Sequence, residues 1–549
     1  MKTSIAFSAL ALLGLGNMAM AMAAPDASNC ARLTGVNMSQ LQIKEARWVQ
    51  GQSATSVQTG KPLHAHCLVT GELQAREGVP AAGGSAHYGI HFELRLPQQW
   101  AQRLYYEGGG GSNGVVAEAI GHVPSLRNGR GYLPALYRGF AVVTSDSGHS
   151  EDQNPGFGND PQARVDYGYA SIGKVTQVAR TLIKAFYQQA PQWSYFAGCS
   201  KGGQEALQAM QRYGHLFDGI IAGAPGYRLP RAALAEAWDS QALASIAPKD
   251  STGQPQLDKA FSDSDLALVA KAVIQQCAGD DGTADSLIVA PQRCSFDPAR
   301  LACSGDKTSA CLSRAQVDGL QRIFAGPTDA EGKPLYSRWF YDSGIASAGW
   351  RAWKLGSEGK PALNVSLGGG SLHHVFMTPP PAAFDIFKAP LQNLATGIAT
   401  RTAQYPQSAL DFMEADNSEL AVFLARKGKL ILYHGVSDPV FSTQDTLAYY
   451  QRLQQRYGAS TADFARMFLV PGMNHCGGGD YALDTFDTLD PIIDWVEHDK
   501  APQRLTASAG LNAGQHLKPG LTRPLCPFPA AAHYVGSGDP DQASSFDCR

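Results

Sequence analysis

A serine stands at the tip of a G-x-S-x-G turn, GCSKG, at residues 198–202. An apolar run precedes this turn, and Ala206, Leu207 and Met210 follow it at helical spacing, so we expect a strand, a sharp turn and a helix. In such a turn the serine hydroxyl is exposed above the end of the strand, where it can act as a nucleophile. The alternative is a glycine-rich connection in which Ser200 has no chemical role.

Two later residues complete a candidate catalytic set. Asp438 follows the apolar run 429–433, and His475 follows the apolar run 467–470. A nucleophilic serine needs a base to accept its proton and an acid to orient that base. Taken singly, the aspartate could be an ordinary turn residue and the histidine a structural one. The order Ser200, Asp438, His475 is nevertheless that of α/β-hydrolases, so the three together predict a catalytic triad.

A glycine-rich segment, EGGGGSNG, occupies residues 107–114 directly after the short apolar segment 104–106. It lacks the Lys-Ser/Thr pair of a phosphate-binding loop, and it also fails the pattern of a dinucleotide-binding turn. In α/β-hydrolases a loop after a strand supplies one amide of the oxyanion hole, and glycine lets that amide approach the substrate oxygen. We expect this role here, with a flexible surface loop as the alternative.

Regular elements must place these residues at one edge of a sheet. Apolar segments alternate with amphipathic ones over much of the chain, which predicts an α/β fold with a doubly wound, mainly parallel sheet of the α/β-hydrolase type. The expected strands lie at residues 87–96, 104–106, 140–144, 193–198, 219–223, 429–433 and 467–470. Helices are expected near 175–186 and 491–496.

The alternation is lost between residues 227 and 414, where turns and four cysteines accumulate. We therefore predict an inserted lid domain at 227–414, over an active site formed by a catalytic domain of residues 24–226 and 415–549. A chain of 549 residues is long enough for such a division.

The N-terminus has the features of an export signal. Lys2 precedes the apolar run 5–15, and Ala-Met-Ala cleavage sites follow at 19–23. We expect residues 1–23 to be removed, leaving a periplasmic or secreted protein without a membrane span; an N-terminal anchor is the alternative.

The net charge of -3 and the lack of a basic stripe argue against a nucleic-acid partner and favour small molecules as ligands. The oligomeric state is not indicated.

Ten cysteines follow this segment, and an even number in an exported chain favours disulfides. No C-x-x-C pair is present, which argues against a zinc ribbon. Local pairing is plausible for Cys277 with Cys294, Cys303 with Cys311 and Cys526 with Cys548, while Cys30 and Cys67 would tie an N-terminal flap. Cys199 adjoins Ser200 and Cys476 adjoins His475. A bond between these two would hold their Cα atoms within about 4.4–6.8 Å and bring the serine and histidine together.

The Gly-Cys-Ser-x-Gly-Gly turn, the later aspartate and the His-Cys pair resemble the tannase and feruloyl esterase family. The similarity runs from Cys30 to Cys548 and is strongest at 107–114, 160–164, 198–203, 433–438, 469–476 and 523–526. The resemblance implies an α/β-hydrolase with a large lid and no organic cofactor. It implies oxyanion-hole amides at Lys201 and Gly109, with Gly108 as the alternative. It also implies five disulfides: Cys30–Cys67, Cys199–Cys476, Cys277–Cys294, Cys303–Cys311 and Cys526–Cys548.

The resemblance further implies a structural calcium ion bound by the lid segment 277–287. Calcium takes about six to eight oxygen ligands from carboxylates and carbonyls. The expected ligands are the side chains of Asp281 and Asp285 and the carbonyls of Thr283 and Leu287. Ala278 stands where relatives carry an aspartate, and Asp280 is the candidate to compensate.

The expected activity is that of a serine carboxylic ester hydrolase acting on esters of aromatic acids through an acyl-enzyme. Phe441 would pack against the substrate ring. In relatives that cleave terephthalate monoesters a lid arginine binds the free carboxylate; that position is Gly370 here, so Arg351 or Lys354 would have to replace it.

Other substrates and other classes of protein stay open at this point. Ferulate, gallate, chlorogenate or phthalate esters are alternative substrates. A non-catalytic exported protein that binds phenolics or carbohydrates is the main rival from another class. A metalloenzyme is less favoured, because the chain lacks the pair of histidines four residues apart that typifies a zinc hydrolase.

Overall fold

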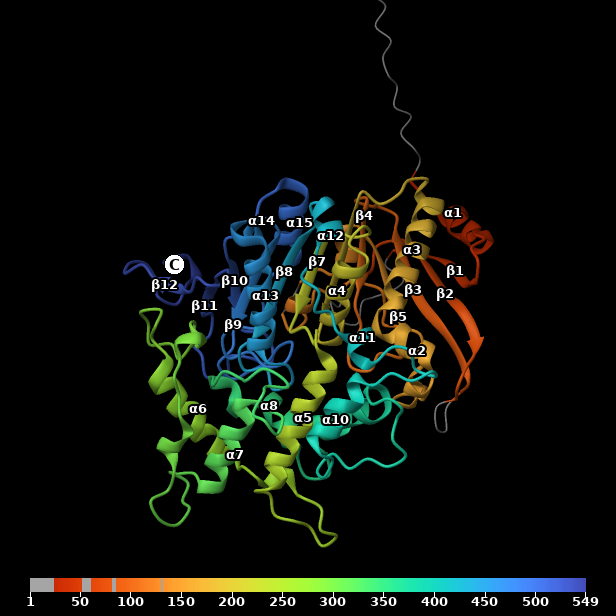
Figure 1. The fold of residues 1–549 in the computed structure, drawn as a ribbon. Coiled ribbons are helices and arrows are strands. Elements are labelled where there is room, and N and C mark those ends of the chain that lie inside the picture. Colours follow the sequence, from red (N-terminus) through yellow and green to blue (C-terminus); the bar gives the residue numbers. More distant parts are fainter. Residues whose placement is uncertain (1–23, 52–60, 81–84, 130–131) are drawn as a thin grey trace, which may run out of the picture.

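The computed structural model describes residues 24–51, 61–80, 85–129 and 132–549. The predicted signal peptide, residues 1–23, lies outside these ranges. Within them, the fold is built around a mixed sheet in the order β1-β2-β3-β5-β4-β6-β7-β8-β9 (Figure 1). Neighbouring strands from β5 to β9 are parallel, while β1, β2, β3 and β5 pair antiparallel. The predicted α/β-hydrolase fold with a mainly parallel sheet is confirmed.

The strands of this sheet coincide with the apolar segments of the sequence. Their bounds are β1 (Leu41–Val49), β2 (His66–Glu77), β3 (His87–Pro97), β4 (Arg103–Glu107), β5 (Phe140–Ser145), β6 (Trp193–Cys199), β7 (Gly219–Gly223), β8 (Lys429–Gly435) and β9 (Ala465–Val470). The expected N-terminal flap is wrong in one respect. Residues 41–49 form the edge strand of the main sheet, because they pair with β2 over most of their length.

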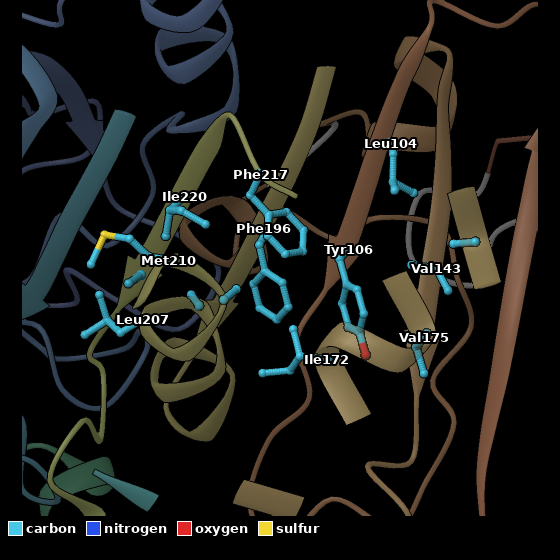
Figure 2. Close-up of a cluster of buried hydrophobic side chains, with 14 of the residues drawn as sticks. Leu104, Tyr106, Val143, Ile172, Val175, Phe196, Leu207, Met210, Phe217 and Ile220 are labelled. Atoms are coloured by element: carbon cyan, nitrogen blue, oxygen red, sulfur yellow. The ribbon is translucent and has the colours of Figure 1, made fainter. Parts of the chain in front are cut away.

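Successive side chains of a strand point to opposite faces, so each face of the sheet has its own core. Tyr106 and Phe196 stack at 4.7 Å between ring centroids on one face, and Tyr105 lies in the core of the other. Figure 2 shows the first core, where Ile172 and Leu207 from two helices reach the sheet. That face is covered by α3 (Ser171–Tyr187), α4 (Lys201–Arg212) and α13 (Thr443–Tyr457), and the opposite face by α15 (Leu489–His498).

A long segment is inserted between β7 and β8, and Figure 1 shows most of its helices gathered at one end of the sheet. Its helices are α5 (Leu229–Ala244), α6 (Asp263–Cys277), α7 (Arg314–Ala325), α8 (Ala348–Lys354), α9 (Gly369–Ser371), α10 (Leu391–Ala399), α11 (Ala409–Met413) and α12 (Ala421–Ala425). Val440 and Phe441, which follow β8, are part of its hydrophobic core. The segment therefore packs directly on a loop that carries one of the predicted catalytic residues.

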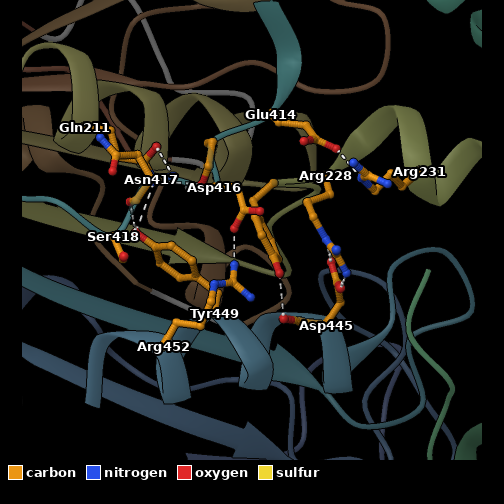
Figure 3. A network of polar contacts seen from close by, with 12 residues as sticks. Gln211, Arg228, Arg231, Glu414, Asp416, Asn417, Ser418, Asp445, Tyr449 and Arg452 are labelled. Carbon is orange, nitrogen blue, oxygen red and sulfur yellow. Dashed lines mark hydrogen bonds and ion pairs between the residues drawn. The ribbon is translucent and has the colours of Figure 1, made fainter. Parts of the chain in front are cut away.

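Ion pairs anchor both ends of the inserted segment to the catalytic core (Figure 3). Arg228, just before α5, pairs with Asp445 on α13, and Arg231 pairs with Glu414 at 2.6 Å. Arg452 on α13 contacts Asp416, and the hydroxyl of Tyr449 donates to the carbonyl of Asn417. Because both junctions are tied to the same helix, α5 has a defined position relative to the sheet.

The remaining elements are short. They are α1 (Ala27–Ala31), α2 (Pro161–Val165), α14 (Thr461–Phe464), and two small antiparallel sheets formed by β10 (Leu505–Ser508) with β11 (Thr522–Leu525) and by β12 (Ala532–Tyr534) with β13 (Phe546–Cys548). In the part of the chain that the structure describes, none of the helices has the length and apolar character needed to span a membrane.

Candidate active site

The serine turn has the strained geometry that its sequence predicts. Ser200 lies between β6 and α4 with φ 65° and ψ -124°. Residues other than glycine rarely adopt a positive φ of this size. Gly198 and Gly202 pass so closely that a Cβ atom on Gly198 would overlap the backbone of Gly202. Such strain persists only where the surroundings enforce it, and it presents the serine hydroxyl at the carboxyl end of the strand.

The structure brings the three predicted catalytic residues together in one hydrogen-bonded row. His475 Nε2 lies 2.7 Å from Ser200 Oγ, and His475 Nδ1 lies 2.8 Å from Asp438 Oδ2. The three residues follow β6, β8 and β9, whose carboxyl ends meet at one edge of the sheet. These distances are within hydrogen-bonding range, so the histidine can accept the serine proton while the aspartate holds the opposite ring nitrogen.

Asp438 is held as a carboxylate by several donors. The backbone N–H groups of Val440 and Phe441 donate to Oδ1, at 2.8 and 3.1 Å, and His434 shares Oδ2 with His475. Burial alone would raise the pKa of Asp438, but the neighbouring His475 and the hydrogen bonds from His434 and His475 lower it well below its usual range. The residue therefore stays ionised and can stabilise a protonated His475.

All five predicted disulfides are present. Cys199 and Cys476 are bonded with their Cα atoms 6.1 Å apart, which joins the serine turn to the histidine loop. The other four pairs are Cys30–Cys67, Cys277–Cys294, Cys303–Cys311 and Cys526–Cys548. The chain segments that carry nucleophile and base are thus covalently linked beside the hydroxyl and the imidazole.

A pocket opens beside Ser200, between the core and the inserted segment. Trp353 and Phe441 both form T-shaped contacts with His475, at centroid distances of 5.5 and 5.2 Å, and both line the pocket. Its other lining residues are Gly111, Tyr167, Lys201, Leu229, Ala233, Glu236, Leu367, Gly368, Ser371, Phe376 and Val440. A mostly apolar, aromatic wall of this kind suits the flat ring of an aromatic acyl group.

The backbone amides predicted to form the oxyanion hole differ in whether they already have a hydrogen-bond acceptor. The Lys201 amide is the first of α4, so it has no acceptor within its own helix and lies next to Ser200. The Gly109 amide, in contrast, donates to Glu205 Oε2 at 2.8 Å, and the Gly108 amide donates to the carbonyl of Ala197. Neither glycine amide is free in this structure, so the prediction for Gly109 does not fit its hydrogen bonding.

A buried glutamate accounts for the position of that amide. Glu205 accepts hydrogen bonds from the amide of Gly109, from Asn113 Nδ2 at 2.8 Å and from the Lys201 ammonium at 2.7 Å. Lys201 and Glu205 are only 1% and 4% exposed, so this is a fully buried ion pair behind the glycine loop. Burial lowers the pKa of Lys201, and Glu205 opposes that shift. Glu205 is not among the site residues predicted from the sequence, although its place on the helix just after the serine was a usable signal.

Glu205→Gln should therefore destabilise the fold by leaving the Lys201 ammonium buried without a counter-charge. Breaking a buried pair in this way costs about 3–5 kcal/mol, so the free energy of unfolding should fall by that amount in a urea titration. Lys201→Met in the same chain removes the stranded charge and should recover most of the loss. An equal loss in the single and double variants would contradict this account of the pair.

The predicted calcium ligands come together, but they already have a cationic neighbour. Arg523 pairs with Asp285 at 2.6 Å and lies 3.7 Å from Asp281. Asp281 is buried and accepts a hydrogen bond from the amide of Thr283, whereas Asp280 is exposed. Among the described residues, no group of three or more His, Cys, Asp and Glu side chains is arranged to hold a metal. The two carboxylates and the loop carbonyls suit calcium, but they supply only part of the oxygen ligands that it takes.

The candidates for binding a substrate carboxylate lie elsewhere. Arg351 pairs with Asp263 at 2.7 Å and donates to the carbonyl of Phe261, and neither contact is in the pocket. The Lys354 ammonium is buried against Asp239. A Cβ atom on Gly370 would meet only Pro155 Cγ, at 3.9 Å, and Gly370 is not among the pocket residues. The expectation that Arg351 or Lys354 replaces the carboxylate-binding arginine is therefore wrong.

The α/β-hydrolase fold, the strained serine and the Ser–His–Asp row define a serine hydrolase. Comparison with known proteins narrows this class. The sequence profile of the family described as tannase and feruloyl esterase matches residues 67–549. The chain therefore belongs to the tannase and feruloyl esterase family and is a carboxylic ester hydrolase.

Individual relatives agree with this assignment. The mono(2-hydroxyethyl) terephthalate hydrolase of Piscinibacter sakaiensis is 40% identical over 548 residues, covering 92% of this chain and 88% of that protein. A probable feruloyl esterase B-1 of Neosartorya fischeri is 27% identical, covering 83% and 82%. The crystal structure of feruloyl esterase B from Aspergillus oryzae superposes with a TM-score of 0.75 at 22% identity, over 95% of this chain and 100% of that one, and so shares the fold.

Proposed function

We propose that the chain hydrolyses esters of aromatic acids, with Ser200 as nucleophile, His475 as general base and acid, and Asp438 as the residue that orients the histidine. The observation that carries this proposal is the unbroken hydrogen-bond row from Ser200 through His475 to Asp438, at 2.7 and 2.8 Å, beside an aromatic-lined pocket. The names of the relatives, a terephthalate monoester hydrolase and a feruloyl esterase, support an aromatic acyl group.

The geometry supports a reaction in two steps, acylation of Ser200 and hydrolysis of the acyl-serine. Ser200 Oγ attacks the ester carbonyl while its proton passes to His475 Nε2, and the imidazolium then protonates the leaving alcohol. A water molecule, deprotonated by the same nitrogen, cleaves the acyl-serine and releases the aromatic acid. The amide of Lys201 would receive the developing negative charge on the carbonyl oxygen. Gly111 lines the pocket, and its amide is the loop candidate for the second donor.

A reactive-serine probe and a substrate panel test the proposal together. A fluorophosphonate should label Ser200 in the wild-type protein, and kcat/KM should be measurable on at least one of mono(2-hydroxyethyl) terephthalate, methyl ferulate and methyl gallate. Labelling with no turnover of any aromatic ester would contradict the proposed substrate class. Absence of labelling would favour the alternative of a non-catalytic protein that binds phenolics or carbohydrates.

We also propose that the protein acts in the periplasm or outside the cell. Disulfides form and persist in oxidising compartments, and the five pairs of this chain join all ten of its cysteines. The export signal predicted at residues 1–23 agrees with that location.

We further propose a structural calcium ion at the loop of Asp281 and Asp285. Two carboxylates against the single charge of Arg523 leave a net negative charge at a buried position, which favours a cation. Bound calcium would be held by the two carboxylates and the loop carbonyls, and it would stabilise that loop without taking part in the reaction. The melting temperature should therefore rise on adding CaCl2 to EDTA-treated protein, and Ala278→Asp should strengthen the effect by adding a ligand. A melting temperature that is the same in EDTA and calcium would contradict this proposal.

A further inference from the structure

Helix α5 lines the pocket, and it carries a carboxyl group, Glu236, at a position where its pattern of side chains predicts an apolar residue. Leu229, Ala233 and Glu236 are spaced i, i+4 and i+7 on α5, so they lie on one face of the helix, and all three line the pocket beside Ser200. Leucine and alanine at the first two positions make an apolar stripe. Glu236 ends that stripe with a side chain that needs a hydrogen-bond partner.

No such partner exists in the described part of the chain. The Glu236 side chain is 4% exposed, and its Oε2 atom is buried without a hydrogen bond. It packs on the bare Cα atom of Gly368, since a Cβ there would overlap this oxygen. Buried polar groups are nearly always paired, and leaving one unpaired costs about 1–3 kcal/mol. An unpaired carboxyl group in a pocket can instead form its hydrogen bond with a polar group of a bound ligand.

The surroundings of Glu236 decide its charge. Burial raises its pKa to about 8; Lys354 opposes this shift, while Asp239 and Asp438 add to it. Lys354 is itself paired with Asp239, so its charge is already balanced. At neutral pH the group is therefore mainly a neutral carboxylic acid, which can donate one hydrogen bond and accept others.

We propose that Glu236 is a specificity-determining residue that binds a ring hydroxyl of the aromatic acyl group. This inference rests on the proposed function, because the ring must enter the pocket beside Ser200. A phenolic hydroxyl both donates and accepts, so it matches a neutral carboxyl group at either oxygen. The apolar face of α5 and the rings of Trp353 and Phe441 would hold the remainder of the ring.

The same wall disfavours an acyl group that ends in a carboxylate. Such a group needs a cation, and the one cationic side chain among the described lining residues, Lys201, is paired with Glu205. Glu236 and such a carboxylate repel each other when both groups are ionised. The pocket therefore selects a hydroxylated ring over a terephthalate ring, which differs from the substrate in the name of the 40% identical relative.

The test compares two esters that differ in one hydroxyl group, methyl 4-hydroxycinnamate and methyl cinnamate, with mono(2-hydroxyethyl) terephthalate alongside. Wild-type kcat/KM should be highest for the hydroxylated ester. Glu236→Leu should lower that value about 10- to 100-fold, through loss of the hydrogen bond to the ring hydroxyl, and change methyl cinnamate less than about 3-fold. Glu236→Gln, which keeps a donor and an acceptor, should retain most of the preference.

Two outcomes would overturn the inference. One is an equal loss on both cinnamates in Glu236→Leu, which would make the residue structural. The other is a wild-type preference for the terephthalate ester. If the wild type turns over none of these esters, and neither methyl ferulate nor methyl gallate, the result would instead refute the proposed function. Folding is checked by melting temperature, which should not fall in Glu236→Leu, because the substitution removes an unpaired buried carboxyl group.

Discussion

Replacing Ser200 by alanine should reduce kcat on an aromatic ester by a factor on the order of 10⁶, the size of loss seen when a serine hydrolase loses its nucleophile. The physical reason is that His475 would have no hydroxyl within reach to deprotonate; at present Nε2 lies 2.7 Å from the serine oxygen. Stopped-assay kinetics with methyl ferulate or methyl gallate measure the effect. The melting temperature should change little, because the substitution removes one partly buried hydroxyl group.

Two further variants make this prediction sharper. His475→Ala alone should cost about as much as Ser200→Ala, and the double variant should be no slower, because nucleophile and base act as a unit. Ser251→Ala, an exposed serine of the inserted segment, is the matched control and should match the wild type. Losses that multiply in the double variant, or turnover retained in Ser200→Ala, would show that the reaction does not run through this pair.

Removing the Cys199–Cys476 disulfide should produce the second-largest loss. In the double serine variant the serine turn and the histidine loop are no longer joined, and a displacement of about 1 Å at reacting atoms can cost on the order of 100-fold in rate. The bond spans 277 residues of sequence. The chain-entropy relation then predicts a loss of stability of about 5–6 kcal/mol. Rates are to be measured at a temperature where the variant is still folded by circular dichroism.

The control is a second disulfide that does not touch the site. Cys303→Ser with Cys311→Ser opens a bond of sequence separation 8 in the inserted segment and should cost only about 2–3 kcal/mol in stability. Its kcat should remain that of the wild type. Full activity in the Cys199 and Cys476 double variant would mean that packing alone positions His475.

Much of this molecule is predictable from its sequence because the signals are local. The serine turn is a short pattern with its own strand and helix, and the order Ser200, Asp438, His475 places each residue after an apolar run. The structure has those runs as β6, β8 and β9, so the three side chains meet at one sheet edge. The resemblance to the tannase and feruloyl esterase family implied a bond between the cysteines next to Ser200 and His475, and it is present.

The tertiary structure decided what each polar group contacts. The sequence pointed to the Gly109 amide for the oxyanion, yet Glu205 accepts that hydrogen bond. It suggested Arg351 as a carboxylate ligand, yet Asp263 pairs with it. It also left residues 41–49 as a flap, although they complete the sheet.

One physical cause explains why some features could be predicted from the sequence and others could be found only in the structure. A turn, a strand or a chain order is a property of neighbouring residues, so sequence alone determined the fold class and the catalytic row. The partner of a buried charge is instead chosen by elements that pack together from distant parts of the chain. Glu205 contacts the glycine loop in this way, and Glu236 lines the pocket without a hydrogen bond to its Oε2 atom from any described residue. Only the packed structure reveals this unpaired carboxyl group, and with it the part of the substrate that the sequence left open.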